Sequence, residues 1–396
     1  MTYRADLDGI RCVAVLMVLI FHFDLVPLGD AGFIGVDMFF VLSGFLISGL
    51  IRDGLERGTF NLKTFFLRRL RRLGPALVVV QAATLALGAV ILLPESMLTL
   101  AEQTLFTQLY VVNIYLWKNV NYFGLHGPHQ PFLHCWSLAV EEQFYLVFPL
   151  LAVLIHRFAR QRWTELLLVC ALASFALNLA FVGSKPEATF YLLPARAWEL
   201  LAGALVHSLE RGFPSSSLRN TAGVVAVALI ATSLVAYNPA VAFPGWFALL
   251  PVAATMGFVV SGTGSGSIVS RALSARWAVY VGKISYSLYL VHWPIRVYTD
   301  ELVGEYPLGW RVGGFVASFL LADALHRFVE QPLRERRRLA TPRQFLLAYG
   351  SVVAVFLGVV SWSIVTRGWE GRFSERVLRL AAWSKDVDEP HRDVGD

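Results

Sequence analysis

Charged side chains are scarce in this sequence: Asp, Glu, Lys and Arg make up 16% of the 396 residues, whereas hydrophobic residues make up 56%. This composition departs strongly from that of soluble globular proteins and indicates an integral membrane protein. The N-terminal stretch, MTYRADLDGI, has two acidic residues before the first apolar run, and no small-residue cleavage site follows. We therefore expect the first apolar run to be a retained span and not a signal peptide.

Cysteine is also scarce, and internal repeats are lacking. Cys12, Cys135 and Cys170 all lie in or beside apolar segments. Their placement suggests neither a disulfide framework nor a zinc site, and we interpret them as small buried hydrophobes. No metal site is predicted. The two halves of the chain show no matching broken helices, which is weak evidence against a transporter built from inverted repeats.

Long apolar runs, by contrast, are plentiful. Runs of about 20 residues are long enough to cross a bilayer. The segment 98–117 is apolar too, but it contains Glu102, Gln103, Gln108 and Asn113, so we expect an interfacial or re-entrant piece there. The predicted fold class is all-α, a polytopic transmembrane helical bundle of about 11 spans. The runs are residues 9–28, 32–51, 73–93, 136–155, 164–183, 190–208, 220–237, 243–261, 281–299, 310–328 and 344–366.

Basic residues gather in alternate loops between these runs. The loops 52–72, 156–163 and 329–343 are rich in Arg, whereas the intervening loops contain Lys118 and Lys185 and little else that is positive. Because cytoplasmic loops of membrane proteins are enriched in Lys and Arg, we predict a cytoplasmic N-terminus and, with an odd span count, a C-terminus on the opposite side. The basic loops form no single stripe, so the net charge of +6 does not indicate nucleic-acid binding.

A few charged or imidazole side chains fall inside the predicted spans, where they are costly unless they face a partner or a cavity. Arg11 and His22 lie eleven residues apart, which on a helix places them on one face, within about 20° and roughly 16 Å apart along the axis. The orientation puts Arg11 toward the cytoplasm and His22 further out. The whole set is Arg11, His22, Asp37, Glu141, Arg196, Glu199, His292 and Asp323.

Helical spacing groups several of these side chains. Ser137, Glu141 and Tyr145 recur every four residues and share a face, and Arg196 and Glu199 are three apart and can pair. The basic block FFLRRLRRLGP presents Arg68, Arg69 and Arg72 at spacings of three and four, a cationic edge that suits phosphate groups. We therefore predict a polar path with an anion site on the cytoplasmic side and an acid–base cluster beyond the midplane.

Each group also has a structural interpretation, which the sequence leaves open. The arginine block is typical of an anchor on anionic lipid headgroups. Arg196 with Glu199 is also typical of a structural pair, and Asp37 of a bond to a neighbouring helix. Glu141 is compatible with solvation at a span entry, and His22 and His292 with satisfied core histidines.

Seven stretches, taken in order, resemble the acyltransferase family 3 of membrane-bound acyltransferases. The resemblance runs from about residue 3 to about residue 335. It implies transfer of an acyl group, usually acetyl from acetyl-CoA, to a hydroxyl of an exported carbohydrate such as O-antigen, peptidoglycan or exopolysaccharide, at the bacterial inner membrane. The stretches are RADLDGIRCVAVLMVLIFH, GFIGVDMFFVLSGFLI, FFLRRLRRLGPAL, LHCWSLAVEEQFYLVFPLL, ARAWELLAGAL, VGKISYSLYLVHWPI and FVEQPLR.

The resemblance also implies roles for individual residues. Arg11 and His22 match the essential arginine and histidine of the family's first helix, and Arg69 and Arg72, followed by Pro75, match its basic motif. Ser285 and Glu330 lie at further motif positions. The predicted catalytic residues are His22, Glu141, Ser137 and Arg11. The predicted acetyl-CoA contacts are Arg68, Arg69, Arg72 and Arg11. The predicted substrate contacts are Asp37, Arg196, Tyr286 and His292. Acetyl-CoA is expected as a co-substrate, with no tightly bound cofactor.

The expected domains are an acyltransferase membrane domain (1–335), an additional transmembrane helix (336–366) and a periplasmic linker or tail (367–396). The last two resemble family members whose membrane domain is followed by an SGNH-type esterase-like domain. No GDS motif with a distant DxxH pair is present, so we expect a membrane half truncated before that domain, with a chain that naturally ends there as the alternative. Expected partners are acetyl-CoA, a carbohydrate acceptor that is free or lipid-linked, membrane lipid, and a periplasmic SGNH-type domain or protein.

The expected mechanism centres on His22, either as general base on the acceptor hydroxyl or as carrier of the acyl group. Glu141 is expected to orient or charge-stabilise this imidazole, and Ser137 to donate to the developing oxyanion. A transporter or flippase that uses the same charges without chemistry is the rival class, and a scaffold for polysaccharide enzymes is a third. Release of CoA from acetyl-CoA distinguishes the enzyme from both.

Overall fold

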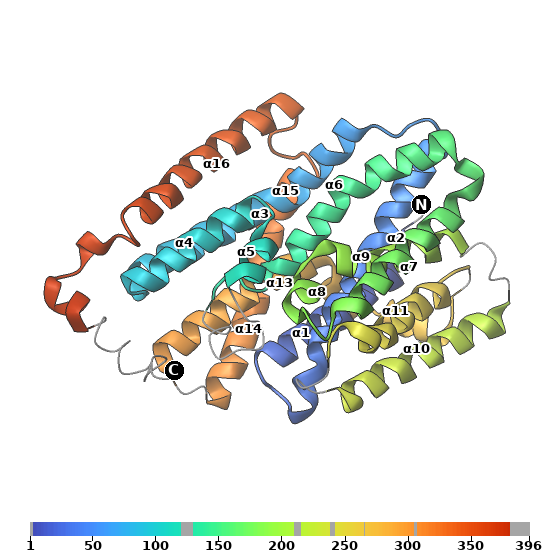
Figure 1. Cartoon of the computed structure of the whole chain (residues 1–396), viewed down its shortest axis with the longest axis horizontal. Coiled ribbons are helices and arrows are strands. Elements are labelled where there is room, and N and C mark those ends of the chain that lie inside the picture. Colours follow the sequence, from blue (N-terminus) through green and yellow to red (C-terminus); the bar gives the residue numbers. More distant parts are fainter. Residues whose placement is uncertain are drawn as a thin grey trace.

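The computed structural model describes residues 3–119, 130–209, 215–237, 242–264, 266–304 and 307–380, and the chain over these ranges is helical and contains no strand (Figure 1). The predicted all-α class is therefore confirmed. Most of the predicted tail falls beyond residue 380 and lies outside the described residues.

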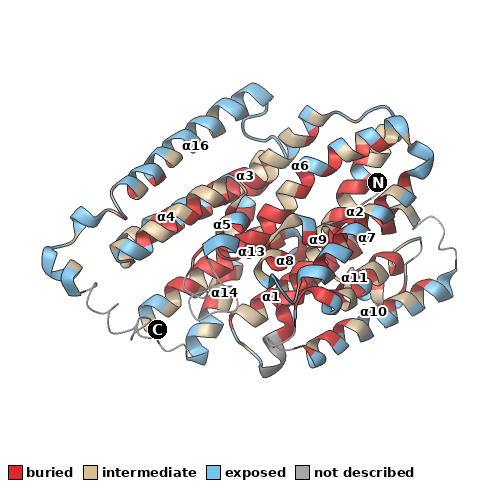
Figure 2. Cartoon of the chain, in the orientation of Figure 1, coloured by how far each residue is buried: buried red, intermediate tan, exposed pale blue. Residues whose placement is uncertain are grey.

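Four helices form the interior of the bundle. α2 (Gly35–Glu56) packs along α9 (Leu193–Leu209), and α1 (Ala5–His22) packs against both α13 (Arg276–Val303) and α2. Figure 2 shows these helices as the most buried part of the molecule. They also carry most of the predicted intramembrane polar groups, so the polar residues are held inside protein and away from lipid.

The other helices surround this interior. α6 and α3 flank the site described below, α7 packs on α9, α10 pairs with α11, α14 lies on α13, and α16 lies against α4 and α3 at the edge of the bundle. Their bounds are α3 (Leu62–Ile91), α4 (Pro94–Gln108), α5 (Val112–Asn119), α6 (Cys135–Phe158), α7 (Trp163–Phe181), α8 (Pro186–Tyr191), α10 (Ser216–Ala236), α11 (Leu249–Ser261), α12 (Ile268–Leu273), α14 (Leu308–Leu325), α15 (Gln331–Arg334) and α16 (Pro342–Val365).

Seven helical segments of the described chain are long and apolar enough to cross a membrane. The remaining predicted spans coincide with α1, α9, α11 and α13. α9 and α11 have only 17 and 13 residues, and α1 and α13 contain several charged side chains. The count of about 11 spans and the sidedness of the termini stay predictions. The seven segments are Ala31–Glu56, Leu62–Ile91, Cys135–Phe158, Arg160–Phe181, Ser216–Ala236, Leu308–Arg334 and Pro342–Val365.

The polar segment 98–117 forms α4 and α5, which are joined by a break at residues 109–111. Gln103 and Asn113 are fully buried, and Asn113 donates to the backbone oxygen of Tyr191 at 3.0 Å. The segment packs inside the protein, so its polar groups find protein partners.

Glycine permits the close approach of α2 and α9. A Cβ atom on Gly44 of α2 would lie 1.7 Å from the backbone oxygen of Leu200, and one on Gly203 of α9 would lie 1.9 Å from that of Val41. Neither backbone oxygen can move without moving its helix. Any larger residue at these positions must therefore push the two helices apart.

We expect Gly44→Ala to lower the stability of the folded protein by about 1–3 kcal/mol, because overpacking forces a backbone shift. Thermal unfolding of the purified protein in detergent measures this as a lower Tm. Gly350→Ala in α16 is the matched control, since no atom lies within 4 Å of its added Cβ. Equal Tm values for the two variants would contradict the tight α2–α9 contact.

Candidate active site

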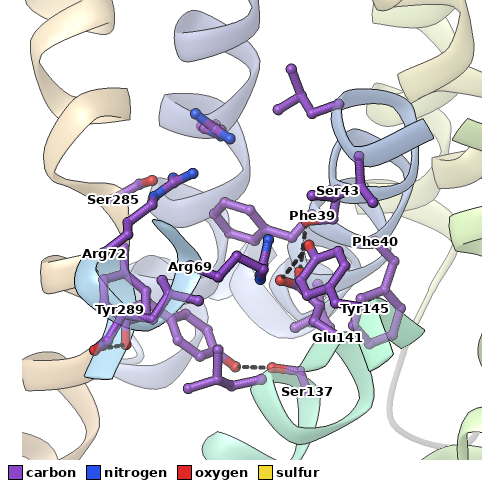
Figure 3. A pocket seen from close by; sticks show the side chains of 17 residues that line it. Phe39, Phe40, Ser43, Arg69, Arg72, Ser137, Glu141, Tyr145, Ser285 and Tyr289 are labelled. Atoms are coloured by element: carbon purple, nitrogen blue, oxygen red, sulfur yellow. Dashed lines mark hydrogen bonds between the residues drawn. The ribbon is translucent and has the colours of Figure 1, made fainter. Parts of the chain in front are cut away.

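A cavity of about 110 Å³ lies at the centre of the bundle, between α1, α2, α3, α6 and α13 (Figure 3). Its wall combines apolar side chains, such as Phe39 and Leu73, with a larger number of polar ones. We call it the inner cavity. The polar side chains that line it are Arg11, Ser43, Arg69, Arg72, Ser137, Glu141, Tyr145, Ser285, Tyr286 and Tyr289.

A second, larger cavity of about 710 Å³ adjoins the inner one near the start of α1. The two share Arg11, Leu46 and Arg72 as lining residues. We call it the outer cavity. Five cationic side chains line it against three carboxylates, together with two histidines, so its wall favours anions. These cationic, acidic and histidine residues are Arg4, Arg11, Arg72, Lys283, Arg334, Asp8, Asp53, Glu335, His207 and His326.

Only some arginines of the basic block of α3 line these cavities. Arg69 pairs with Glu142 at 2.6 Å, and its guanidinium lies 3.3 Å from the centre of the Tyr145 ring. Arg72 lines both cavities, and its buried Nε has no hydrogen-bond partner among the described residues. Arg68 is exposed and lines neither cavity, so these cavities lend no support to its contact with acetyl-CoA, which stays a prediction.

Glu141 lies in the wall of the inner cavity between two hydroxyl donors. Ser43 donates to one of its oxygens at 3.0 Å and Tyr145 to the other at 3.2 Å (Figure 3). The predicted face of α6 is therefore present, with Ser137 also in the cavity wall. The expectation that Glu141 orients His22 is wrong, because the hydrogen-bond partner of His22 is His292.

Ser137 and Tyr289 close the inner cavity on one side. Their hydroxyl groups are 2.7 Å apart, and the Tyr289 hydroxyl donates to the backbone oxygen of His134 at 2.8 Å. The Tyr289 ring centre lies 5.3 Å from that of His134 and 5.4 Å from that of His292. The Tyr289 side chain thus has the inner cavity on one side and a histidine cluster on the other.

The histidine cluster brings together His22, His134 and His292. Nδ1 of His22 lies 2.8 Å from Nε2 of His292, and the two rings are stacked with 8° between their planes. The His134 ring packs edge-on against His292. His22 ends α1, and Arg296 donates to its backbone oxygen at 3.0 Å, which satisfies one of the carbonyls left open at a helix end. His22 is partly exposed and does not line the inner cavity.

Asp37, Arg196 and Glu199 form a separate, enclosed ion cluster. Arg196 lies 3.1 Å from an oxygen of each carboxylate, and all three side chains are at most 1% exposed. Four aromatic rings surround the guanidinium at 5.3–5.8 Å, and they belong to Phe40, Trp136, Phe190 and Phe243. None of the three charged residues lines the inner or outer cavity, so these cavities lend no support to the substrate contacts of Asp37 and Arg196, which stay predictions.

Of the remaining predicted positions, two lie in the wall of the inner cavity and Glu330 lies outside both cavities. Tyr286 and Ser285 line the inner cavity, and the Tyr286 hydroxyl donates to the backbone oxygen of Leu73 at 2.8 Å. Glu330 is buried in a π-helical turn, where one of its oxygens lies 2.8 Å from Nδ1 of His326 and accepts from Ser287.

Sequence analysis missed Tyr289 and Ser43. Tyr289 falls on one face of α13 with Ser285 and His292, at spacings of four and three, so helical periodicity offered a signal for it. Ser43 stood in an apolar stretch without any such pattern.

The fold and site are those of a polytopic helical membrane protein with a polar cavity between its central helices and a histidine cluster beside it. Residues 4–327 match the family model described as an acyltransferase domain, and the chain belongs to this family, acyltransferase family 3.

The peptidoglycan O-acetyltransferase OatA of Listeria monocytogenes is 32% identical over 354 residues, which cover 84% of this chain and 56% of the relative. The O-acetyltransferase OatA of Staphylococcus aureus strain NCTC 8325 is 30% identical over 351 residues, 84% of this chain and 58% of the relative. The chain thus spans little more than half the length of these relatives. No solved structure matches it.

Proposed function

We propose that this protein is a membrane O-acyltransferase of the bacterial inner membrane, which transfers an acetyl group from cytoplasmic acetyl-CoA toward a hydroxyl of an exported carbohydrate. Family membership and the OatA relatives support acyl transfer, and peptidoglycan is the acceptor that one relative's name specifies. The observation that carries the proposal is the serial arrangement of a cationic outer cavity, a small inner cavity and a histidine cluster. An acyl donor, its thioester group and a carbohydrate acceptor would occupy these three places in that order.

The outer cavity suits the anionic part of acetyl-CoA. Its cations exceed its carboxylates, and Arg72 lies with Arg11 at the junction between the cavities. With the N-terminus in the cytoplasm, this cavity opens on the cytoplasmic side. The narrow inner cavity then takes the pantetheine end with the acetyl group, where the Ser137 hydroxyl becomes a donor for a developing oxyanion once it turns away from Tyr289.

The same residues can carry out the proposed transfer by two routes. In the first, Nε2 of His22 removes the acceptor's hydroxyl proton, and the hydroxyl oxygen forms a bond to the thioester carbon. The carbon–sulfur bond breaks, and the CoA thiolate then takes the proton from His22. In the second, Nε2 attacks the thioester carbon and the carbon–sulfur bond breaks, which releases CoA as a thiolate. The acceptor hydroxyl oxygen then attacks the acyl carbon, the carbon–nitrogen bond to His22 breaks, and the hydroxyl proton passes to the CoA thiolate. Both routes yield an ester and one CoA thiol.

An acceptor must reach His22 from the side opposite the outer cavity. The partial exposure of His22 at the end of α1 is compatible with such access. We propose that an SGNH-type domain or separate protein on the periplasmic side receives the acyl group, as the resemblance to fused family members implies. Lipid-linked and free carbohydrates are both compatible with this position, and membrane lipid covers the apolar outer helices.

CoA release from acetyl-CoA in membrane vesicles tests the proposal, because a transporter or a scaffold releases none. We expect Arg72→Ala to raise the KM for acetyl-CoA about tenfold to 100-fold, which corresponds to the loss of one charge-assisted hydrogen bond of roughly 1.5–3 kcal/mol. Arg68→Ala is the matched control, since Arg68 is an arginine of the same block that lies outside both cavities. An unchanged KM in Arg72→Ala would remove the phosphate site from the junction.

A further inference from the structure

The His292 ring links His22 to the backbone of α13. Its Nδ1 lies 2.7 Å from the backbone oxygen of Tyr289, and its Nε2 lies 2.8 Å from Nδ1 of His22. Both ring nitrogens of His292 are therefore engaged, and neither is left for a substrate. The substrate contact predicted for His292 is accordingly replaced by a contact with His22.

The positions of the protons on the His22 and His292 rings follow from which ring nitrogens donate and which accept. A carbonyl oxygen only accepts, so Nδ1 of His292 carries a proton. His292 is fully buried and both its hydrogen bonds go to uncharged groups, an environment that favours a neutral ring. A neutral imidazole has one proton, so Nε2 of His292 accepts. The proton in the bond between the rings then belongs to Nδ1 of His22, and Nε2 of His22 keeps its lone pair.

The surroundings hold His22 in this orientation. Its ring is stacked on His292 with centres 5.1 Å apart, and the Trp293 ring centre lies 4.5 Å away on α13. Arg296, one turn further along α13, donates to the backbone oxygen of His22. One helix therefore sets the tautomer, the ring plane and the backbone position of His22. Of the bonded pair, His292 is fully buried whereas His22 is partly exposed, so His22 is the one placed to meet an acceptor.

We propose that His292 is a positioning residue that fixes His22 as the tautomer with a free Nε2 and directs that atom toward the reacting groups. The inference rests on the proposed acyl transfer, because it assigns a role within that reaction. When Nε2 of His22 takes a proton or forms an acyl bond, the ring becomes cationic, and its Nδ1–H bond to His292 stabilises the charge. No carboxylate is needed for this role.

The first test observes the tautomer without any activity. In ¹⁵N solid-state NMR of the protein in lipid bilayers with labelled histidine, the His22 signals are assigned by their loss in His22→Ala. We expect Nδ1 protonated and Nε2 unprotonated at neutral pH, and a mixture of both tautomers in His292→Asn. A His22 protonated at Nε2, or a His22 signal unchanged by His292→Asn, overturns the proposal even if acyl transfer is confirmed.

The second test compares two amides. Glutamine at position 292 can place an oxygen near the site of Nε2 and accept from His22, whereas the shorter asparagine can replace only the Nδ1 side of the ring. We expect His292→Gln to keep most of the maximal rate of CoA release, and His292→Asn to lower it about 100-fold with an unchanged KM for acetyl-CoA, since misdirected acid–base catalysis costs roughly 10²–10⁴-fold.

His156→Gln is the control and should match the wild type, because this histidine lies in the last turn of α6 and lines neither cavity. A merely structural role for His292 predicts equal losses in its glutamine and asparagine variants, or a raised KM, and either result overturns the positioning role. If wild-type vesicles release no CoA, the proposed function fails, and the NMR result alone decides whether His292 sets the tautomer.

Discussion

Replacing His22 by alanine should lower acetyl transfer by about 10²–10⁴-fold, because the only group proposed to move the acceptor proton or to carry the acetyl group is then missing. Acetyl-CoA should still bind with wild-type affinity, since His22 lines neither of the cavities that we propose for the donor. Transfer of labelled acetyl groups to glycans and equilibrium binding of acetyl-CoA to purified protein measure the two quantities separately. Unchanged transfer by His22→Ala would exclude both proposed routes.

The same variant separates the two routes with one further measurement. If His22 carries the acetyl group, wild-type protein quenched with acid in the absence of acceptor retains label, and His22→Ala retains none. If His22 acts as a base, neither protein is labelled. His156→Ala is a suitable control, because this histidine lies at the far end of α6 and lines neither cavity, and it should match the wild type in every assay.

Sequence periodicity predicted most helices of this fold but not which of them form its interior. The apolar runs located α2, α6, α7, α10, α14 and α16 within a few residues, whereas α3 begins eleven residues before its predicted run. α1 and α13 also appeared as apolar runs, although their charged residues are tolerable only because other helices shield them. Hydropathy is a property of one segment by itself. Burial depends on which other helices pack against that segment, and the hydropathy pattern does not contain this information.

The basic block of α3 shows the same limit at the level of single side chains. Spacing predicted an edge formed by Arg68, Arg69 and Arg72, but the structure turns Arg68 outward. Arg71, which the pattern left aside, is buried and donates to the backbone oxygens of Leu339 and Thr341 before α16. Helical spacing gives the angles between side chains around one helix. The neighbouring helices determine which of these side chains face the interior.

Depth in the membrane likewise does not identify a hydrogen-bond partner. His22 and Glu141 were predicted on the same side of the midplane, and each was a plausible catalytic group. The structure separates them, because Glu141 bonds to Ser43 and Tyr145 while His22 bonds to His292. The His22–His292 pair joins α1 to α13, which are about 270 residues apart in sequence. No local pattern contains such a contact.

The enclosed ion cluster gives the second large expected effect. Arg196→Met should destabilise the folded protein by about 3–5 kcal/mol, because the change leaves the carboxylates of Asp37 and Glu199 buried without a cation. We expect little folded protein in membranes, measured by size-exclusion chromatography of detergent extracts with a fluorescent fusion. A contact with substrate predicts instead normal amounts of folded protein with a raised KM for the acceptor, so the two interpretations give opposite results.

A triple variant isolates the cause of that loss. Arg196→Met combined with Asp37→Asn and Glu199→Gln removes all three charges while it keeps the shapes of the side chains, so no charge is left uncompensated inside the bundle. We expect this variant to regain most of the folded protein that Arg196→Met loses, since replacing a whole buried ion cluster by neutral groups is often close to neutral for stability. Equal losses in the single and triple variants would show that the guanidinium itself, through its packing among the four aromatic rings, holds α2 against α9.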